Sequence, residues 1–120
     1  MKKLNHINLD NIFVGVIGLG YVGIHLAIKF GEKRQVIGFD INKKRIKELK
    51  LGIDNTREFS KEEILNAKKI TFTNDTNYLT EINCYIVAVP TPINKSKNPE
   101  LKPLINATKM IGNFLKKNDI

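Results

Sequence analysis

The chain has 120 residues, of which 42% are apolar and 27% charged, and 20 Lys and Arg against 12 Asp and Glu give a formal net charge of +8. This length allows one domain with one hydrophobic core, and the composition excludes a disordered tail, a collagen-like fibre and, with Cys84 as the only cysteine, a disulfide scaffold. No apolar stretch approaches the ~20 residues that cross a bilayer, and polar residues follow the N-terminal lysines where a signal peptide would be apolar. We therefore expect a cytoplasmic protein without a membrane partner.

The basic residues are scattered at positions expected on solvated helix faces, and aromatic residues do not alternate with them. The sequence therefore gives no support for a nucleic-acid partner beyond its charge. A basic surface does suit an anionic small molecule that carries phosphates. The spacing of His, Cys, Asp and Glu residues suggests no metal site.

The first half of the chain alternates apolar runs with helical periods. Residues 12–17 are rich in β-branched residues and predict a buried strand. The helical period of residues 21–30 follows, with Gly31 as its stop. The stripe expected to face inward consists of Val22, Leu26 and Phe30.

A second strand and a second helix follow the same order. Residues 35–39 predict another buried strand, which Asp40 closes. Residues 42–51 predict a helix that Asn42 caps, with Ile46 and Leu49 facing the core.

The second half continues the alternation less regularly. Ser60 and Glu63 have the spacing of a capping box, which opens a short helix. The Pro90-Thr91-Pro92 segment ends the most apolar strand of the chain. In order, the predicted elements are a helix to about residue 67, a strand at 70–73, a short helix at 75–82, a strand at 83–89 and a last helix at 103–117.

Strands that alternate with helices predict an α/β fold of the Rossmann-like, doubly wound class, with a parallel sheet and right-handed crossovers. The expected order of its four strands is 3-2-1-4. Four strands are little more than half of a six-stranded domain, and the pattern requires another strand after the last helix. We therefore expect residues 1–120 to be a truncated Rossmann domain, a fragment of a longer protein.

Residues 18–23 match the pattern G-x-G-x-x-G directly after a predicted strand and at the start of a predicted helix. In this context the pattern indicates a dinucleotide-binding turn. Gly18 permits the tight turn, Gly20 lets a pyrophosphate approach the backbone, and Gly23 lets the helix pack closely on the strand. The free amides of the helix N-terminus would hold the anion.

Asp40 ends the second strand, 22 residues after Gly18. A carboxylate at this place accepts hydrogen bonds from the adenosine ribose and repels a 2′-phosphate, which favours NAD over NADP. Lys43, Lys44 and Arg45 leave the alternative open, since basic residues here can receive a 2′-phosphate. We expect NAD because the acid occupies the nearest position.

Three further features are weaker. Cys84 lies in an apolar strand and is expected to be a packed, inert thiol. His25 has no evident carboxylate or serine partner, so we expect a structural or surface role. The Pro90-Thr91-Pro92 segment follows the fourth strand where the strand order reverses, the place at which ligands bind, although it also fits a plain strand terminator.

With these residues placed, the chain resembles the N-terminal domain of the UDP-glucose/GDP-mannose dehydrogenase family over nearly its whole length. The resemblance depends on residues 16–23, 38–46 and 87–92, above all on Tyr-Val within the glycine motif and Thr-Pro after the fourth strand. Pro90-Thr91-Pro92, with Pro99, Leu101 and Leu104 after it, is most similar to the branch that oxidises UDP-N-acetylhexosamines (UDP-GlcNAc or UDP-GalNAc) for capsule, O-antigen or Vi-type polysaccharides. His25 stands where the family usually has proline.

The resemblance implies an oxidoreductase that converts the C6 hydroxyl of a UDP-sugar to a carboxylate in two NAD-dependent steps. It implies that Asp40 and Arg45 contact the adenosine ribose region. The residues that it places at the pyrophosphate are Gly18, Leu19, Gly20, Tyr21, Val22 and Gly23, and those that it places along the cofactor near the sheet are Val89, Pro90 and Thr91.

The same resemblance implies what this chain lacks. The family's catalytic cysteine, the lysine, asparagine and aspartate residues that assist it and most of the UDP-sugar site lie in a C-terminal domain, and Cys84 matches no catalytic position. The family's dimers form through a central helix that is also absent. We therefore expect residues 1–120 to bind NAD without turnover, and the full-length parent to be a homodimer.

Two other functions share parts of the pattern. A non-enzymatic, NAD-sensing regulatory module would keep the glycine turn and Asp40 but has no need of Pro90-Thr91-Pro92. A methyltransferase would hold S-adenosylmethionine with a glycine-rich turn and an acid after the second strand. Gly23 at the start of the helix argues for a pyrophosphate ligand instead.

Overall fold

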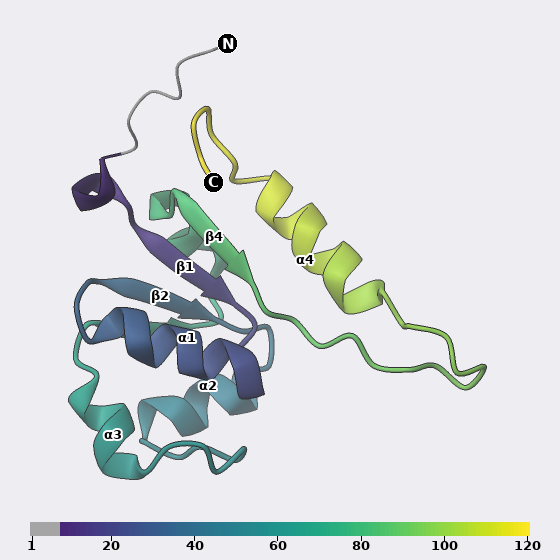
Figure 1. The fold of residues 1–120 in the computed structure, drawn as a ribbon, viewed down its shortest axis with the longest axis horizontal. Coiled ribbons are helices and arrows are strands. Elements are labelled where there is room, and N and C mark those ends of the chain that lie inside the picture. The colour runs from purple at the N-terminus through teal and green to yellow at the C-terminus, as the bar shows by residue number, and fades with distance from the viewer. Residues whose placement is uncertain (1–7) are drawn as a thin grey trace.

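A computed structural model describes residues 8–120 of the chain (Figure 1). The strands form one parallel sheet in the predicted order β3-β2-β1-β4. No helix within this range has the length and apolar character of a membrane span. In chain order the elements are η1 (Leu9–Asn11), β1 (Val14–Ile17), α1 (Tyr21–Gly31), β2 (Val36–Phe39), α2 (Lys43–Lys50), α3 (Lys61–Asn66), β3 (Ile70–Thr73), η2 (Thr76–Glu81), β4 (Cys84–Val87) and α4 (Lys102–Gly112), where η marks a 3-10 helix.

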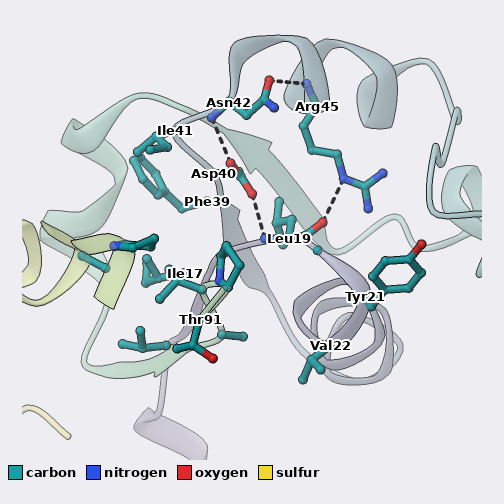
Figure 2. A pocket seen from close by; sticks show the side chains of 18 of the residues that line it. Ile17, Leu19, Tyr21, Val22, Phe39, Asp40, Ile41, Asn42, Arg45 and Thr91 are labelled. Atoms are coloured by element: carbon teal, nitrogen blue, oxygen red, sulfur yellow. Dashed lines mark hydrogen bonds between the residues drawn. The ribbon is translucent and has the colours of Figure 1, made fainter. Parts of the chain in front are cut away.

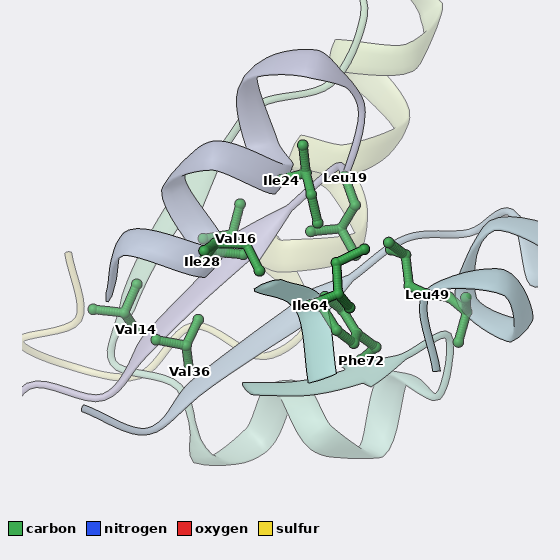
Figure 3. Close-up of a cluster of buried hydrophobic side chains, with 11 residues drawn as sticks. Val14, Val16, Leu19, Ile24, Ile28, Val36, Leu49, Ile64 and Phe72 are labelled. Atoms are coloured by element: carbon green, nitrogen blue, oxygen red, sulfur yellow. The ribbon is translucent and has the colours of Figure 1, made fainter. Parts of the chain in front are cut away.

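One face of the sheet is covered by α1, α2 and α3. Val14, Val16 and Val36 of the sheet face these helices, and Leu19 of the turn after β1 joins them (Figure 3). The helices contribute Ile24, Ala27, Ile28, Ile46, Leu49 and Ile64. Because side chains alternate along a strand, this face takes every second residue of β1 and β2.

The opposite face is covered by η2 and α4. Ile17, Ile37 and Phe39 pack there against Leu79 and Ile82. Ala107 and Ile111 of α4 complete this second cluster. Figure 1 shows α4 apart from the other helices and joined to β4 by a long extended segment. The sheet is therefore doubly wound, as the alternation predicts.

Local signals place the helix starts. The Asn42 side chain accepts a hydrogen bond from the Arg45 amide at 3.1 Å, which caps α2. Ser60 and Glu63 form the predicted capping box at the start of α3. Both caps are local in sequence, which is why the sequence reveals them.

The inward stripe predicted for α1 is only partly correct, because Leu26 and Phe30 are partly buried against the first cluster but the centre of the buried face lies elsewhere. The buried residues are Gly23, Ile24, Ala27, Ile28 and Gly31, whereas Val22 is 65% exposed. Gly31 is the last residue of the helix, where the sequence places its stop, and the Ile70 side chain occupies the space that a Cβ at this position would need. The close approach of β3 is therefore a second reason for a small residue here.

The last helix ends at Gly112, five residues earlier than predicted. The chain then turns, and Lys116 Nζ donates hydrogen bonds to the carbonyls of Thr80 and Ile82 at 3.0 and 3.3 Å. Ile120 then lies beside β4, donating to the Asn83 carbonyl and accepting from the Tyr85 amide in the pattern of a parallel pair. Contacts that are distant in sequence fix this segment, so helical periodicity misplaces its boundary.

Ile64 and Leu65 on α3 give a matched test of the core. Ile64 is 3% exposed within the first cluster and Leu65 is 48% exposed. Ile64→Ala is expected to lower the free energy of unfolding by about 2–5 kcal/mol because it leaves a cavity. Leu65→Ala is expected to change it by about 0.5 kcal/mol or less. Urea unfolding measures both values, and equal losses would contradict the packing described here.

Candidate functional site

The glycine turn joins β1 to α1. Gly18 has a φ of +98°, and a Cβ there would lie 2.7 Å from the Ala88 carbonyl oxygen. A Cβ on Gly23 would overlap the Gly18 carbonyl oxygen. The first position thus requires the left-handed region and the second a close approach of helix to turn, the two structural roles that the motif predicts.

The turn presents unused amides. The first bond of α1 runs from the Ile24 amide to the Gly20 carbonyl at 3.1 Å. Within residues 8–120, the amides of Gly20, Tyr21, Val22 and Gly23 have no acceptor. A Cβ on Gly20 would meet nothing within 4 Å. The helix N-terminus therefore has both free donors and open space for an anion.

Leu19 is held on three sides. Its amide donates to Asp40 Oδ2 at 2.9 Å, and its carbonyl accepts from Arg45 Nε at 2.8 Å (Figure 2). Its side chain is fully buried in the first cluster. The backbone of the turn is thus fixed to the end of β2 and to the first turn of α2.

Asp40 lies at the rim of the site, where the sequence places it. Its Oδ1 accepts the Asn42 amide at 2.9 Å while Oδ2 accepts the Leu19 amide. A carboxylate has about four acceptor sites, so each oxygen keeps a free lone pair for a further donor.

Arg45 is buried, with 5% of its side chain exposed. Besides Leu19, its guanidinium contacts Asp54 Oδ1 and Asn55 Oδ1, both at 2.7 Å from Nη1. Its Nη2 is buried and has no partner within the described residues. The guanidinium therefore faces inward, against the turn and the segment after α2.

Asp54 lies behind the site and was missed by the sequence analysis: it does not line the cavity but contacts Arg45, which does. Its side chain has no exposed surface, and it accepts from Thr56 Oγ1 at 2.7 Å as well as from the amides of Thr56, Glu58 and Phe59. An Asp followed by Thr two residues later is a local turn signal, and it could have identified Asp54 as a residue that hydrogen-bonds its own segment. The ion pair with Arg45 joins residues nine apart through the tertiary fold.

Burial alone would raise the pKa of Asp54, but hydrogen bonds outweigh it. The donors are the Thr56 hydroxyl, Arg45 and the amides of Thr56 and Phe59, and together they lower the pKa from 3.8 to about 2. Asp54 is therefore ionised at every pH at which the protein is expected to work.

A cavity of about 960 Å³ is lined by the glycine turn, Asp40 and Arg45. One end lies at Asp40, Asn55 and Thr56, and the other lies at α4, where Lys102, Asn106 and Met110 line it. Gly18 to Val22 and Val87 to Thr91 form its floor at the carboxyl ends of β1 and β4. The predicted site residues Val89, Pro90 and Thr91 therefore lie with the glycine turn, and the residues from α4 are additions that no motif indicates.

Exposed apolar side chains border the same cavity. Tyr21 and Val22 are each 65% exposed and Ile41 is 78% exposed, and all three line it. Isolated exposed apolar residues are common, but three around one cavity suit a ligand with flat or apolar parts.

Two other residues have new placements. His25 Nε2 lies 2.9 Å from Glu58 Oε2, so the expectation that His25 lacks a carboxylate partner is wrong. The pair joins α1 to the segment after α2, two parts that are distant in sequence.

Cys84 is a free, partly buried thiol on β4 that packs against the first cluster. Within residues 8–120, no three His, Cys, Asp or Glu side chains are grouped as a metal site.

The low pKa of Asp54 predicts an acid dependence of stability. A folded-state pKa of about 2, below the ordinary 3.8, contributes stability that is present above pH ~4 and is lost as the pH falls towards about 2. Asp54→Asn removes this contribution. Urea unfolding between pH 2 and 5 should therefore show a shallower acid loss in the variant, and parallel curves would contradict the assignment.

Comparison with known proteins agrees with this geometry. The sequence model of the "UDP-glucose/GDP-mannose dehydrogenase family, NAD binding domain" matches residues 12–120. A UDP-N-acetyl-D-glucosamine 6-dehydrogenase of Salmonella typhi is 49% identical over 93% of this chain and 26% of its own length. Protein CapL of Staphylococcus aureus is 44% identical over 85% of this chain and 24% of its own.

Superposition on solved structures agrees with the sequence comparison. The solved structure of a UDP-D-ManNAc dehydrogenase from Pyrococcus horikoshii superposes with a TM-score of 0.81, at 27% identity, over 91% of this chain and 27% of that one. This chain thus spans about a quarter of the length of the curated relatives it matches. The family match over nearly all of the described residues leads to one conclusion: the chain belongs to the UDP-glucose/GDP-mannose dehydrogenase family, and residues 12–120 match its NAD binding domain.

Proposed function

We propose that residues 1–120 are the cofactor domain of an NAD-dependent UDP-sugar 6-dehydrogenase. The single observation that supports NAD binding most directly is the row of free amides at Gly20 to Gly23, of which Gly20, Tyr21 and Val22 line the cavity together with Asp40. A substrate of the UDP-N-acetylhexosamine class is supported by the Salmonella typhi relative. The product would be a uronic acid for surface polysaccharide such as capsule or O-antigen.

In this proposal the pyrophosphate lies against the amides of Gly20 to Gly23. Those groups have no protein acceptor, and the partial positive charge of the α1 N-terminus favours an anion there. Gly20 has open space where a side chain would stand, so the phosphates can approach the backbone. The residues present therefore fit a dinucleotide.

The adenosine ribose would lie at Asp40, whose oxygens keep free lone pairs for the two hydroxyls. Two of the three basic residues nearby, Lys44 and Arg45, lie next to acids and therefore favour a 2′-phosphate less than the sequence suggests. Arg45 faces inward to Asp54, and Lys44 lies 3.8 Å from Glu48. Arg45 lines the same end of the cavity, so its contact with the ribose region is part of the proposal, as is the contact of Val89, Pro90 and Thr91 with the cofactor.

NAD supplies the hydride acceptor for the oxidation, and this chain contributes the groups that bind and orient it. We assign no catalytic residue to residues 1–120. In this proposal the UDP-sugar binds mainly to a C-terminal domain of a longer, homodimeric and cytoplasmic protein.

Parallel titration of the purified chain with NAD, NADP and S-adenosylmethionine tests the function. We expect saturable binding of NAD, at least about tenfold weaker binding of NADP because Asp40 repels the 2′-phosphate, and no binding of S-adenosylmethionine. Isothermal titration calorimetry measures all three. Preference for NADP or S-adenosylmethionine would overturn the proposal.

Gly20→Ala tests the phosphate position. The methyl group would occupy the space in which a phosphate approaches the backbone, so NAD affinity should fall roughly tenfold or more. Gly112→Ala on α4 is the matched control, because a Cβ there also meets nothing within 4 Å and Gly112 lies outside the cavity. Both variants should unfold near the wild-type temperature. Equal NAD affinity in the two would place the phosphates elsewhere.

A further inference from the structure

The segment after α2 encloses a carboxylate that belongs to no helix or strand. Asp54 accepts four hydrogen bonds from residues 56–59 of its own segment and one from Arg45. A second link, between His25 and Glu58, attaches the same segment to α1. Asp54 is therefore held rigidly in relation to both helices that flank the glycine turn.

The ion pair of Asp54 with Arg45 is almost completely buried, with exposed side-chain fractions of 0% and 5%. Burying two charges has a desolvation cost that cancels much of their attraction, so such a pair contributes little net stability compared with apolar residues. A geometric role accounts for it better. Nε is held by the Leu19 carbonyl (Figure 2), while Nη1 is held by Asp54. These two contacts fix the plane of the guanidinium.

The bond to Leu19 has a consequence for the next residue. The Leu19 carbonyl and the Gly20 amide belong to one planar trans peptide, so they point in opposite directions. When Arg45 holds the carbonyl, the Gly20 N–H points away from Arg45. Gly20 lines the cavity, and its amide is the first of the free donors.

We propose that Asp54 is a positioning residue for cofactor binding, which acts through Arg45 to set the direction of the Gly20 amide. This inference rests on the proposed function for its ligand. Asp54 is not expected to touch NAD itself. The contact between Asp54 and Arg45 orients the amide donors before the ligand binds. This role of Asp54 is separate from any direct contact that Arg45 makes with the ribose.

Asp54→Asn removes the charge with little change of shape. The expected result is roughly tenfold weaker NAD binding by calorimetry and a shifted Gly20 amide resonance in the ¹⁵N-labelled chain without ligand. Tyr85→Phe is the control, since it removes a 2.9 Å hydrogen bond to the Leu79 carbonyl outside the cavity. It should lower stability while leaving NAD affinity and the Gly20 resonance unchanged.

A double-mutant cycle separates positioning from general destabilisation. If Asp54 acts through Arg45, Asp54→Asn should cost no further NAD affinity in an Arg45→Met background. Additive losses would overturn the proposal, as would wild-type affinity and an unchanged Gly20 resonance in Asp54→Asn. If Asp54→Asn does not fold, Asp54→Glu, which keeps the charge but alters its reach, is measured in the same way.

The two proposals fail in different ways. Absence of NAD binding by the wild-type chain overturns the proposed function. The Gly20 resonance still tests the link from Asp54 in that case, because it is measured without ligand.

Discussion

The site depends on how one residue of the turn after β1 is held. The Leu19 amide donates a hydrogen bond to Asp40, and the Leu19 carbonyl accepts one from Arg45. The Leu19 side chain is buried in the core. These three contacts fix the backbone of the turn at Leu19. The neighbouring residues, Gly18 and Gly20, have no side chains that could hold it. Free amides are useful for binding only if their direction is set in advance, and these contacts set it.

The sheet provides the platform for this arrangement. β1 lies between β2 and β4, so the carboxyl ends of all three strands meet at the glycine turn. The two clusters of buried side chains then fix α1 on one face and α4 on the other. The cavity opens where the crossover connections leave in opposite directions, which is the general ligand position in doubly wound sheets.

The net charge of the chain is +8, but the charged side chains of Arg45, Asp54 and Asp40 at the site are each paired or hydrogen-bonded. The buried cation Arg45 is balanced by Asp54, and the carboxylate of Asp40 is stabilised by two backbone amides. The attraction for a pyrophosphate is thus assigned mainly to main-chain donors rather than to the scattered lysines. In the proposed binding mode this division explains how an acid can lie beside a site for an anion, because Asp40 would face the ribose and the amides would face the phosphates.

The alternation of strands and helices, the glycine turn and the position of Asp40 could be predicted from the amino-acid sequence, because they follow from local periodicity, caps and short spacings in the chain. The strand order then followed from the fold class that this alternation indicates. Four features became visible only in the folded chain: the inward face of α1, the early end of α4, the His25–Glu58 pair and the buried link from Asp54 through Arg45 to Leu19. These features depend on side chains that meet only after the sheet has formed. Periodicity describes one segment at a time and contains no information on which side chain of another segment will lie against it.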